Sequence, residues 1–189
     1  MTLPGTDTLI IEQPWHIGRH LWGASYRTTV YDERGALLAT VTEREGPRLP
    51  RRVLRRIGFA GRSRYDLVLA WQGQPLLVVR KGMGKPPAQV FRPDGTPIGS
   101  VRRQGRNRFL LQDPTGQQLG LFHDVAWFSF GEVTKRDGRR VRRDVLRLPP
   151  GAPEPVRSLA IGTAVAFDVV RGIGTGETIG HWSGFVPSS

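Results

Sequence analysis

Cysteine is absent from this sequence of 189 residues. Its absence excludes disulfide bonds, thiolate metal sites and cysteine nucleophiles, and it fits a reducing compartment. The first residues, MTLPGTDTLIIEQP, also lack the basic start and the long apolar run of a secretory signal. We therefore expect a cytoplasmic protein.

A linker rich in Pro, Gly or Ser between two complete halves is also missing. A chain of this length can bury one sizeable core. We therefore expect a single domain at residues 20–171, with an N-terminal segment at 1–19 before it and a flexible tail at 172–189 after it.

Acidic residues are few: 16 Asp and Glu stand against 28 Lys and Arg, which gives a net charge of +12. Such an excess favours acidic partners, namely phospholipid head groups or nucleic acid. A genome rich in G and C would produce the same arginine content without any function, so the charge alone does not select between these explanations.

One pattern recurs along the chain: an apolar pair, a turn with a glycine, and a second apolar segment. It is written VFRPDGTPIGSV at 90–101, LQDPTGQQLGLF at 111–122 and VYDERGALLATV at 30–41, with looser copies at 69–79 and 133–141. The turn glycines are Gly35, Gly73, Gly95, Gly116 and Gly138. Glycine accepts a positive φ and Asp bonds the turn backbone, so each copy predicts a β-hairpin. One hairpin is too small to bury its own face, so we expect the hairpins to share one sheet.

Aliphatic side chains follow each turn glycine at fixed distances. The residue three positions later is Leu38, Leu76, Ile98, Leu119 or Val141. Six positions after the glycine, the first four copies have another apolar residue, whereas the fifth has Asp144. We interpret the fifth copy as a degraded one.

A different pattern begins after the last hairpin. From residue 159 to residue 170, only Gly162, Thr163 and Asp168 are not apolar. Prolines precede this run and a glycine follows it, which predicts a helix at 156–171. A membrane span needs about 20 apolar residues, so this shorter helix should be enclosed by protein rather than form a transmembrane span. It is the one candidate to fill the lumen of a barrel made of hairpins.

These features resemble the tubby-like barrel superfamily, in particular its LURP-one-related and phospholipid-scramblase-like proteins. The resemblance rests on the repeated hairpins, on GEVTKR at 131–136 and on SLAIGTAVAFDVV at 158–170. Within the second motif, Ala164, Ala166 and Asp168 are similar to the end of the family's helix. The resemblance implies a mainly β fold, a closed antiparallel barrel of roughly 12 strands around a buried hydrophobic C-terminal helix.

The calcium-dependent scramblases have an acidic segment before this helix. The present sequence has RRDVLRLPPGAPEP there, and Asp144 and Glu154 are its acids. Calcium binds through several carboxylate and carbonyl oxygens. We therefore expect no metal site in this chain.

The segment GPRLPRRVLRRIGFAGRSR at 46–64 holds seven Arg and no acid. Leu49, Val53 and Ile57 recur in it at helical spacing, with arginines on the other faces, which predicts a short basic amphipathic helix. Such a helix can lie on anionic lipid. The alternative is that its apolar stripe plugs the barrel and its arginines are solvated.

Two further basic groups follow the second strand of a hairpin, one around Lys81 and one around Arg103. In a meander these links lie at the end opposite to the turns, so we expect a barrel with a basic rim. The turn acids are Asp32, Glu33, Asp94, Asp113 and Asp137. The candidate lipid- or polyanion-binding residues are Arg51, Arg52, Arg55, Arg56, Lys81, Lys85, Arg102, Arg103 and Arg106.

Signals for catalysis are weak. His16 and His20 stand four positions apart without a third metal ligand. KGMGKP lacks the Ser or Thr of a phosphate-binding loop, and GIGTGETIG follows a helix where a dinucleotide-binding loop should open one. We expect no enzyme, no catalytic residue and no cofactor.

The expected function is a non-enzymatic, scramblase-like β-barrel module that contacts anionic phospholipid or a membrane surface through its basic rim. Binding to lipid would place it peripherally at the inner face of the membrane. The alternatives are a nucleic-acid-binding protein that uses the same surface, and a structural barrel that binds a protein partner.

Overall fold

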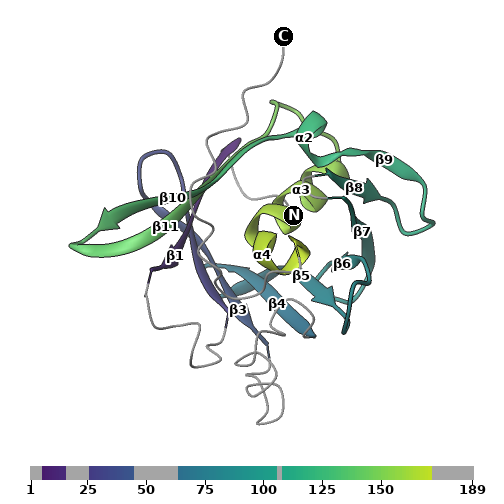
Figure 1. The fold of residues 1–189 in the computed structure, drawn as a ribbon, viewed down its shortest axis with the longest axis horizontal. Helices are drawn as coiled ribbons and strands as arrows, with labels where there is room; N and C mark the ends of the chain where they lie inside the picture. The colour runs from purple at the N-terminus through teal and green to yellow at the C-terminus, as the bar shows by residue number, and fades with distance from the viewer. Residues whose placement is uncertain (1–5, 16–25, 45–63, 106–107, 172–189) are drawn as a thin grey trace.

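Eleven antiparallel strands form one curved sheet in the computed structural model (Figure 1), which describes residues 6–15, 26–44, 64–105 and 108–171. The strands are β1 (Thr8–Pro14), β2 (Arg27–Tyr31), β3 (Leu37–Glu43), β4 (Tyr65–Trp71), β5 (Gln74–Lys81), β6 (Ala88–Phe91), β7 (Pro97–Gln104), β8 (Arg108–Gln112), β9 (Gln118–Leu121), β10 (Trp127–Arg136) and β11 (Arg139–Arg147). Their order across the sheet is β10-β11-β1-β2-β3-β4-β5-β6-β7-β8-β9. The described helices are α2 (Phe122–Val125), α3 (Val156–Val165) and α4 (Phe167–Arg171). The expected mainly β fold is confirmed.

Each predicted turn glycine joins two paired strands. β2 pairs with β3, β4 with β5, β6 with β7, β8 with β9, and β10 with β11. All five glycines have a positive φ, between 74° and 91°. Glycine takes this conformation without a steric cost, so the turn sequence alone is enough to favour each hairpin. The prediction of five hairpins in one sheet is confirmed.

The aliphatic residue three positions after the glycine forms a β-bulge in the first four hairpins. Ile98, for example, lies between two residues of β7 that pair with adjacent residues of β6. The same register shift occurs at Leu38, Leu76 and Leu119. Without an extra residue, positions three and six after the glycine would face opposite sides of a strand. The bulge lets both positions pack against the core, which explains the spacing in the sequence.

The helical segment lies inside the curve of the sheet, as Figure 1 shows. Every residue from 159 to 170 is buried, and α3 contacts β5, β6, β7, β8 and β11. Gly162 permits this close approach, because a Cβ atom there would lie 3.2 Å from a methyl group of Val90. The prediction of an enclosed helix is confirmed, with a break at Ala166 between α3 and α4.

Between β9 and β10 the sheet formed by the described residues is open. Neighbouring strands alternate in direction, so the first and the last of eleven strands run the same way. Closing the sheet would require a parallel pair, which needs a connection of about a dozen residues or more. Residues 122–126 alone connect β9 to β10. The described sheet therefore does not show the closed barrel that the sequence predicted.

Helix α2 and a group of phenylalanines cover this opening. α2 contacts β8, β9, β10 and α3. The ring of Phe128 in β10 lies edge-on to Phe122 and to Phe167, at centroid distances of 5.4 Å and 4.7 Å. Phe130 lies 4.8 Å from Phe167. Aromatic packing thus joins β10 to α2 and to the central helix without backbone pairing.

Strand β1 lies in the middle of the sheet, between β11 and β2. It pairs with β11 from Thr8 to Pro14, and its side chains Leu9 and Ile11 are buried in the core. The sheet thus includes residues that the sequence analysis placed in a segment before the domain. No helix in the described part of the chain has the length and apolar character needed to cross a membrane.

Candidate functional site

The described links between hairpins lie at one end of the strands, and the hairpin turns lie at the other end. We call these two ends of the strands the two edges of the curved sheet. β5 and β7 run in the same direction, since both are antiparallel to β6. Their ends at Lys81 and Gln104 therefore share one edge, and the turns at Gly95 and Gly116 share the other. We call the first the basic edge, whose described residues are the ends of β3, β5 and β7, the starts of β4, β6 and β8, and the described residues that link them. We call the second the turn edge, formed by the turns at Gly35, Gly73, Gly95 and Gly116.

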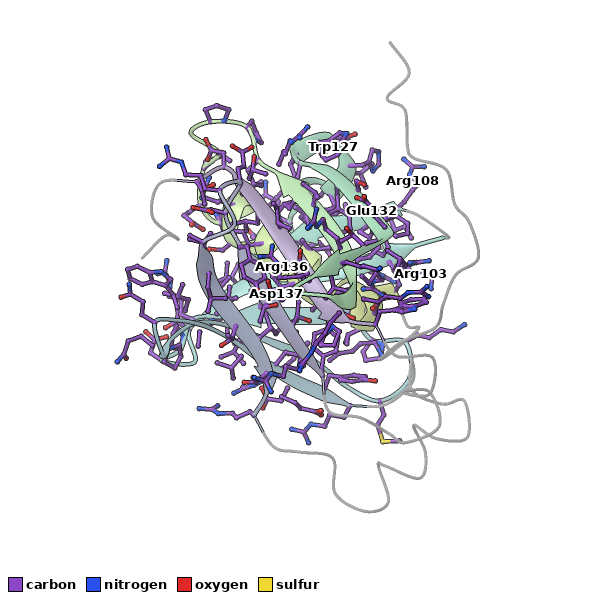
Figure 2. The ribbon with its side chains drawn as sticks, turned by 90° about the vertical axis from the view of Figure 1, so that its left-hand side faces the viewer. Arg103, Arg108, Trp127, Glu132, Arg136 and Asp137 are labelled. Carbon is purple, nitrogen blue, oxygen red and sulfur yellow. The ribbon has the colours of Figure 1, made fainter. Side chains whose placement is uncertain are left out.

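Four of the predicted binding residues are described, and all of them lie at the basic edge: Lys81, Lys85, Arg102 and Arg103. Lys85 and Arg102 are exposed. Figure 2 shows Arg103 on the same side of the molecule as Arg108, which begins the neighbouring strand β8. The basic groups that followed different hairpins in the sequence are therefore gathered at one edge.

Lys81 differs from the other three because it is buried. Lys81 is 4 % exposed, and its Nζ donates a hydrogen bond to the carbonyl of Gly84 at 3.0 Å. Burial lowers the pKa of Lys81. Because the Lys81 amine is buried and bonded to its own loop, it presents little charge to a large polyanion. The exposed charges among the described candidates belong to Lys85, Arg102 and Arg103.

Arg103 lies at the C-terminal end of the central helix. Its Nε donates to the carbonyl of Gly105 at 2.8 Å, and its Nη1 donates to the carbonyl of Arg171, the last residue of α4. A cation at this position satisfies a terminal carbonyl and complements the helix dipole. Burial lowers the pKa of Arg171, whose guanidinium lies 4.9 Å over the ring of Phe130. Arg103 therefore stabilises the helix end in addition to carrying an exposed charge.

The remaining candidates lie outside the described residues: Arg51, Arg52, Arg55, Arg56 and Arg106. The first four belong to the segment that joins β3 to β4. The described residues on either side of that segment, Arg44 and Arg64, follow β3 and precede β4 at the basic edge. Arg44 and Arg64 are therefore the described residues that flank the arginine-rich segment in the chain.

Acids of the turn edge bind the turn backbone. Asp94 Oδ1 accepts a hydrogen bond from the N–H group of Thr96 at 2.8 Å. Asp113 Oδ1 accepts from the N–H groups of Thr115 and Gln117, both at 2.9 Å. The Thr96 N–H lowers the pKa of Asp94, and the hydroxyl of Thr115 lowers the pKa of Asp113. These carboxylates shape the hairpins, as is typical of Asp in turns.

Asp137 does not lie at the turn edge, contrary to the prediction. β10 runs opposite to the first strands of the other four hairpins, because α2 joins β9 to a strand that runs in the same direction as β9. Figure 1 shows the β10–β11 hairpin projecting outward from the curved sheet. Asp137 instead occupies a two-residue turn with Gly138, at φ angles of 48° and 74°.

An ion cluster that the sequence analysis missed lies between the sheet and the helix. Arg142 of β11 lies 2.7 Å from Asp168 of α4 and 3.1 Å from Asp144, and both carboxylates are buried. Burial alone would lower the pKa of Arg142, but the two carboxylates outweigh it and raise that pKa above its ordinary value. Asp144 also accepts a hydrogen bond from the N–H group of Gly131 at 2.8 Å, at the bulge of β10. We call Arg142, Asp144 and Asp168 the interior ion cluster.

The repeat contained a signal for this cluster. Asp144 stands six positions after its turn glycine, where other copies have fully buried residues such as Val41 and Val101. An acid at an inward-facing position needs a buried partner, because an unpaired charge is costly there. The residue that looked like a degraded repeat is therefore one of the two acids that hold Arg142 between the sheet and the helix.

A second ion cluster lies on the outer face of the sheet. Glu12 of β1 is 1 % exposed and accepts hydrogen bonds from Arg136 and Arg143 at 2.5 to 3.2 Å. The guanidinium of Arg136 also lies 3.8 Å over the ring of Tyr31. These two arginines stabilise the pairing of β1 with the β10–β11 hairpin.

Among the described residues, no group of three or more His, Asp or Glu side chains could hold a metal ion. Comparisons of the chain with protein-family models, with curated proteins and with solved structures find no match. Evidence about function therefore comes from the geometry of this chain itself.

Proposed function

We propose that this chain is a non-enzymatic binding module of the tubby-like, scramblase-like kind, which contacts the anionic phospholipid of a membrane surface through its basic edge. The curved sheet of hairpins around a hydrophobic C-terminal helix supports the comparison with that superfamily. One observation carries the functional part: exposed basic side chains gather at one edge, while the acids of the opposite edge are bound to their own turns.

Clustered charge raises the local potential above that of the same charges scattered over a surface. Each Lys or Arg close to an anionic membrane contributes about 1 kcal/mol to binding. Lys85, Arg102 and Arg103 supply part of this charge, and the seven arginines of the segment 46–64, which follows β3 and precedes β4 in the chain, would add to it. A peripheral position at the inner face of a membrane would follow from such binding.

Nucleic acid is the alternative polyanion for a basic edge. Proteins that bind single strands combine basic grooves with aromatic side chains on which the bases stack. The described residues of the basic edge at 81–85 and 102–105 include no aromatic side chain. This composition favours a contact with head groups over a contact with bases.

Sedimentation with vesicles tests the proposal. We expect the protein to sediment with anionic vesicles at low salt, to remain in solution with neutral vesicles, and to stay on the anionic vesicles when duplex DNA is added. Changing Arg51, Arg52, Arg55 and Arg56 to Gln should weaken vesicle binding by a few kcal/mol at low salt and leave the fold intact. If the protein prefers the DNA, nucleic acid is the partner in place of lipid. If it binds neither, the basic edge is not a polyanion site.

A further inference from the structure

The outer half of strand β10 is an exposed edge of the sheet. In the described part of the chain, β10 pairs with β11 alone. Its first half is covered, because Phe128 and Phe130 pack on the helix. Beyond the bulge, Glu132, Val133 and Lys135 are exposed, and Val133 is 46 % exposed although it is apolar.

The backbone of this half presents hydrogen-bonding groups on its free side. Arg136 pairs with Arg139 across a two-residue turn, and in such hairpins the residues that flank the turn bond to each other. Pairing then alternates along the strand, so Thr134 bonds to β11 while the N–H and C=O groups of Val133 and Lys135 point the other way. Two donors and two acceptors are therefore available for another strand.

The charge around this edge selects the kind of strand. Lys135 and Arg140 form a cross-strand pair, so their exposed side chains lie on the same face of the hairpin. A second copy of this chain, paired through the same strand, would bring its own Lys135 and Arg140 to this surface and so place like charges together. An acidic segment would bring opposite ones. Figure 2 shows Arg136 and Asp137 of this hairpin well apart from Arg103 at the basic edge.

We propose that the outer half of β10 binds an acidic peptide segment in extended conformation, as an added strand of the sheet. The backbones of Val133 and Lys135 would hold the peptide backbone, as in other cases of strand addition. Side chains of one face of the peptide, at every second position, would place carboxylates near Lys135 and Arg140. This site is separate from the basic edge and does not depend on lipid binding.

A synthetic peptide of alternating Glu and Thr serves as the probe, with a peptide of alternating Lys and Thr as its control. Val133→Pro removes an outward N–H group and keeps every charge and the pairing with β11, which proline at an edge permits. We expect this variant to bind the Glu peptide about two- to tenfold more weakly, as the loss of one backbone hydrogen bond implies, while its binding to anionic vesicles is unchanged. Changing Lys135 and Arg140 to Gln should weaken peptide binding and reduce its dependence on salt.

Hydrogen exchange on the unmodified chain gives a readout that no substitution can disturb. The amides of Val133 and Lys135 should become protected when the Glu peptide is added, and the amide of Thr134 should be protected with or without it. Equal binding of the peptide by the Val133→Pro variant, or unprotected amides at both positions, would overturn the proposal. So would a fall in the molecular mass in solution on Val133→Pro, because the edge would then belong to a second copy.

Discussion

The interior ion cluster and the basic edge use the same kind of charge in opposite ways. In the interior, Arg142 lies between Asp144 and Asp168, and the sheet and the helix shield all three. At the basic edge, Lys85 and Arg102 are exposed to solvent. The first arrangement holds the helix against the sheet, and the second can meet a partner.

The difference teaches that a net charge of +12 overstates what a partner encounters. Lys81 is buried, and Arg136 and Arg143 are engaged by Glu12. Such residues count in the composition but contribute little to a binding surface. Basic content becomes informative about function only after each cation has been assigned its partner and its exposure.

The largest expected effect comes from adding an unpaired charge to the interior. Ala164 is 1 % exposed, and Ala164→Arg would bury a guanidinium in the packed space between helix and sheet. The cost of an unpaired buried charge is comparable to the whole stability of a domain, about 5–15 kcal/mol. We expect no folded protein by circular dichroism and size exclusion. Gln89→Arg adds the same charge on an exposed residue of β6 and should fold normally; a folded Ala164→Arg variant would contradict the enclosure of the helix.

Removing the cation of the interior ion cluster is expected to have the next largest effect. Arg142→Leu would leave two buried carboxylates without their partner, which typically costs about 3–5 kcal/mol in the free energy of unfolding. Burial raises the pKa of Asp144 and Arg142 opposes that rise, so this pKa would rise further without the cation, and the defect should shrink as the pH falls and grow as it rises. Urea unfolding at several pH values measures this. Arg140→Leu, at an exposed position of the same strand, should change stability by about 0.5 kcal/mol or less, and an equal loss in both variants would refute the special role of Arg142.

Changes to the acids of the turn edge should have a smaller effect, since Asp94 is exposed, Asp113 is partly exposed, and solvent screens both. Hydrogen bonds lower the pKa of Asp94 and Asp113 below the ordinary value of 3.8. The stability that they contribute is therefore present above that value and is lost as the pH falls through the lowered pKa. The double variant D94N/D113N should melt below the native chain at neutral pH, and the two melting temperatures should converge as the pH falls below the lowered pKa values. Glu33→Gln is the control, and a gap that persists in acid would argue against this cause.

Local sequence was sufficient for the hairpins and for the helix. A turn glycine with positive φ and an aliphatic residue three positions later are short-range features, and both were found where the structure has a turn and a bulge. Strand β1 was missed because no hairpin turn marks it and its neighbours are β2 and the distant β11. Closure of the barrel is not confirmed in the described sheet, because the number of strands decides whether the first and last strands can pair, and local sequence does not fix that number.

The candidate site was predictable only in part. Strand direction placed the links at one edge, so Lys85, Arg102 and Arg103 were found together. Lys81 was expected to be exposed with them, but its burial depends on the packing of the loop at Gly84. The contact of Arg142 with Asp168 joins a strand to a helix that lies inside the curve of the sheet, and no spacing rule connects the two.

Two double variants with the same loss of charge test the basic edge most directly. Lys85 and Arg102 are exposed at the basic edge, and Arg34 and Arg92 are exposed at the turn edge. At low salt, K85Q/R102Q should weaken binding to anionic vesicles by about 2 kcal/mol, or roughly 30-fold, because each charge near the membrane contributes about 1 kcal/mol. R34Q/R92Q should change binding by about twofold or less, since those charges would lie beyond the reach of the membrane field. Equal losses in the two variants, at unchanged melting temperatures, would show that only total charge matters and would contradict a basic edge that binds lipid.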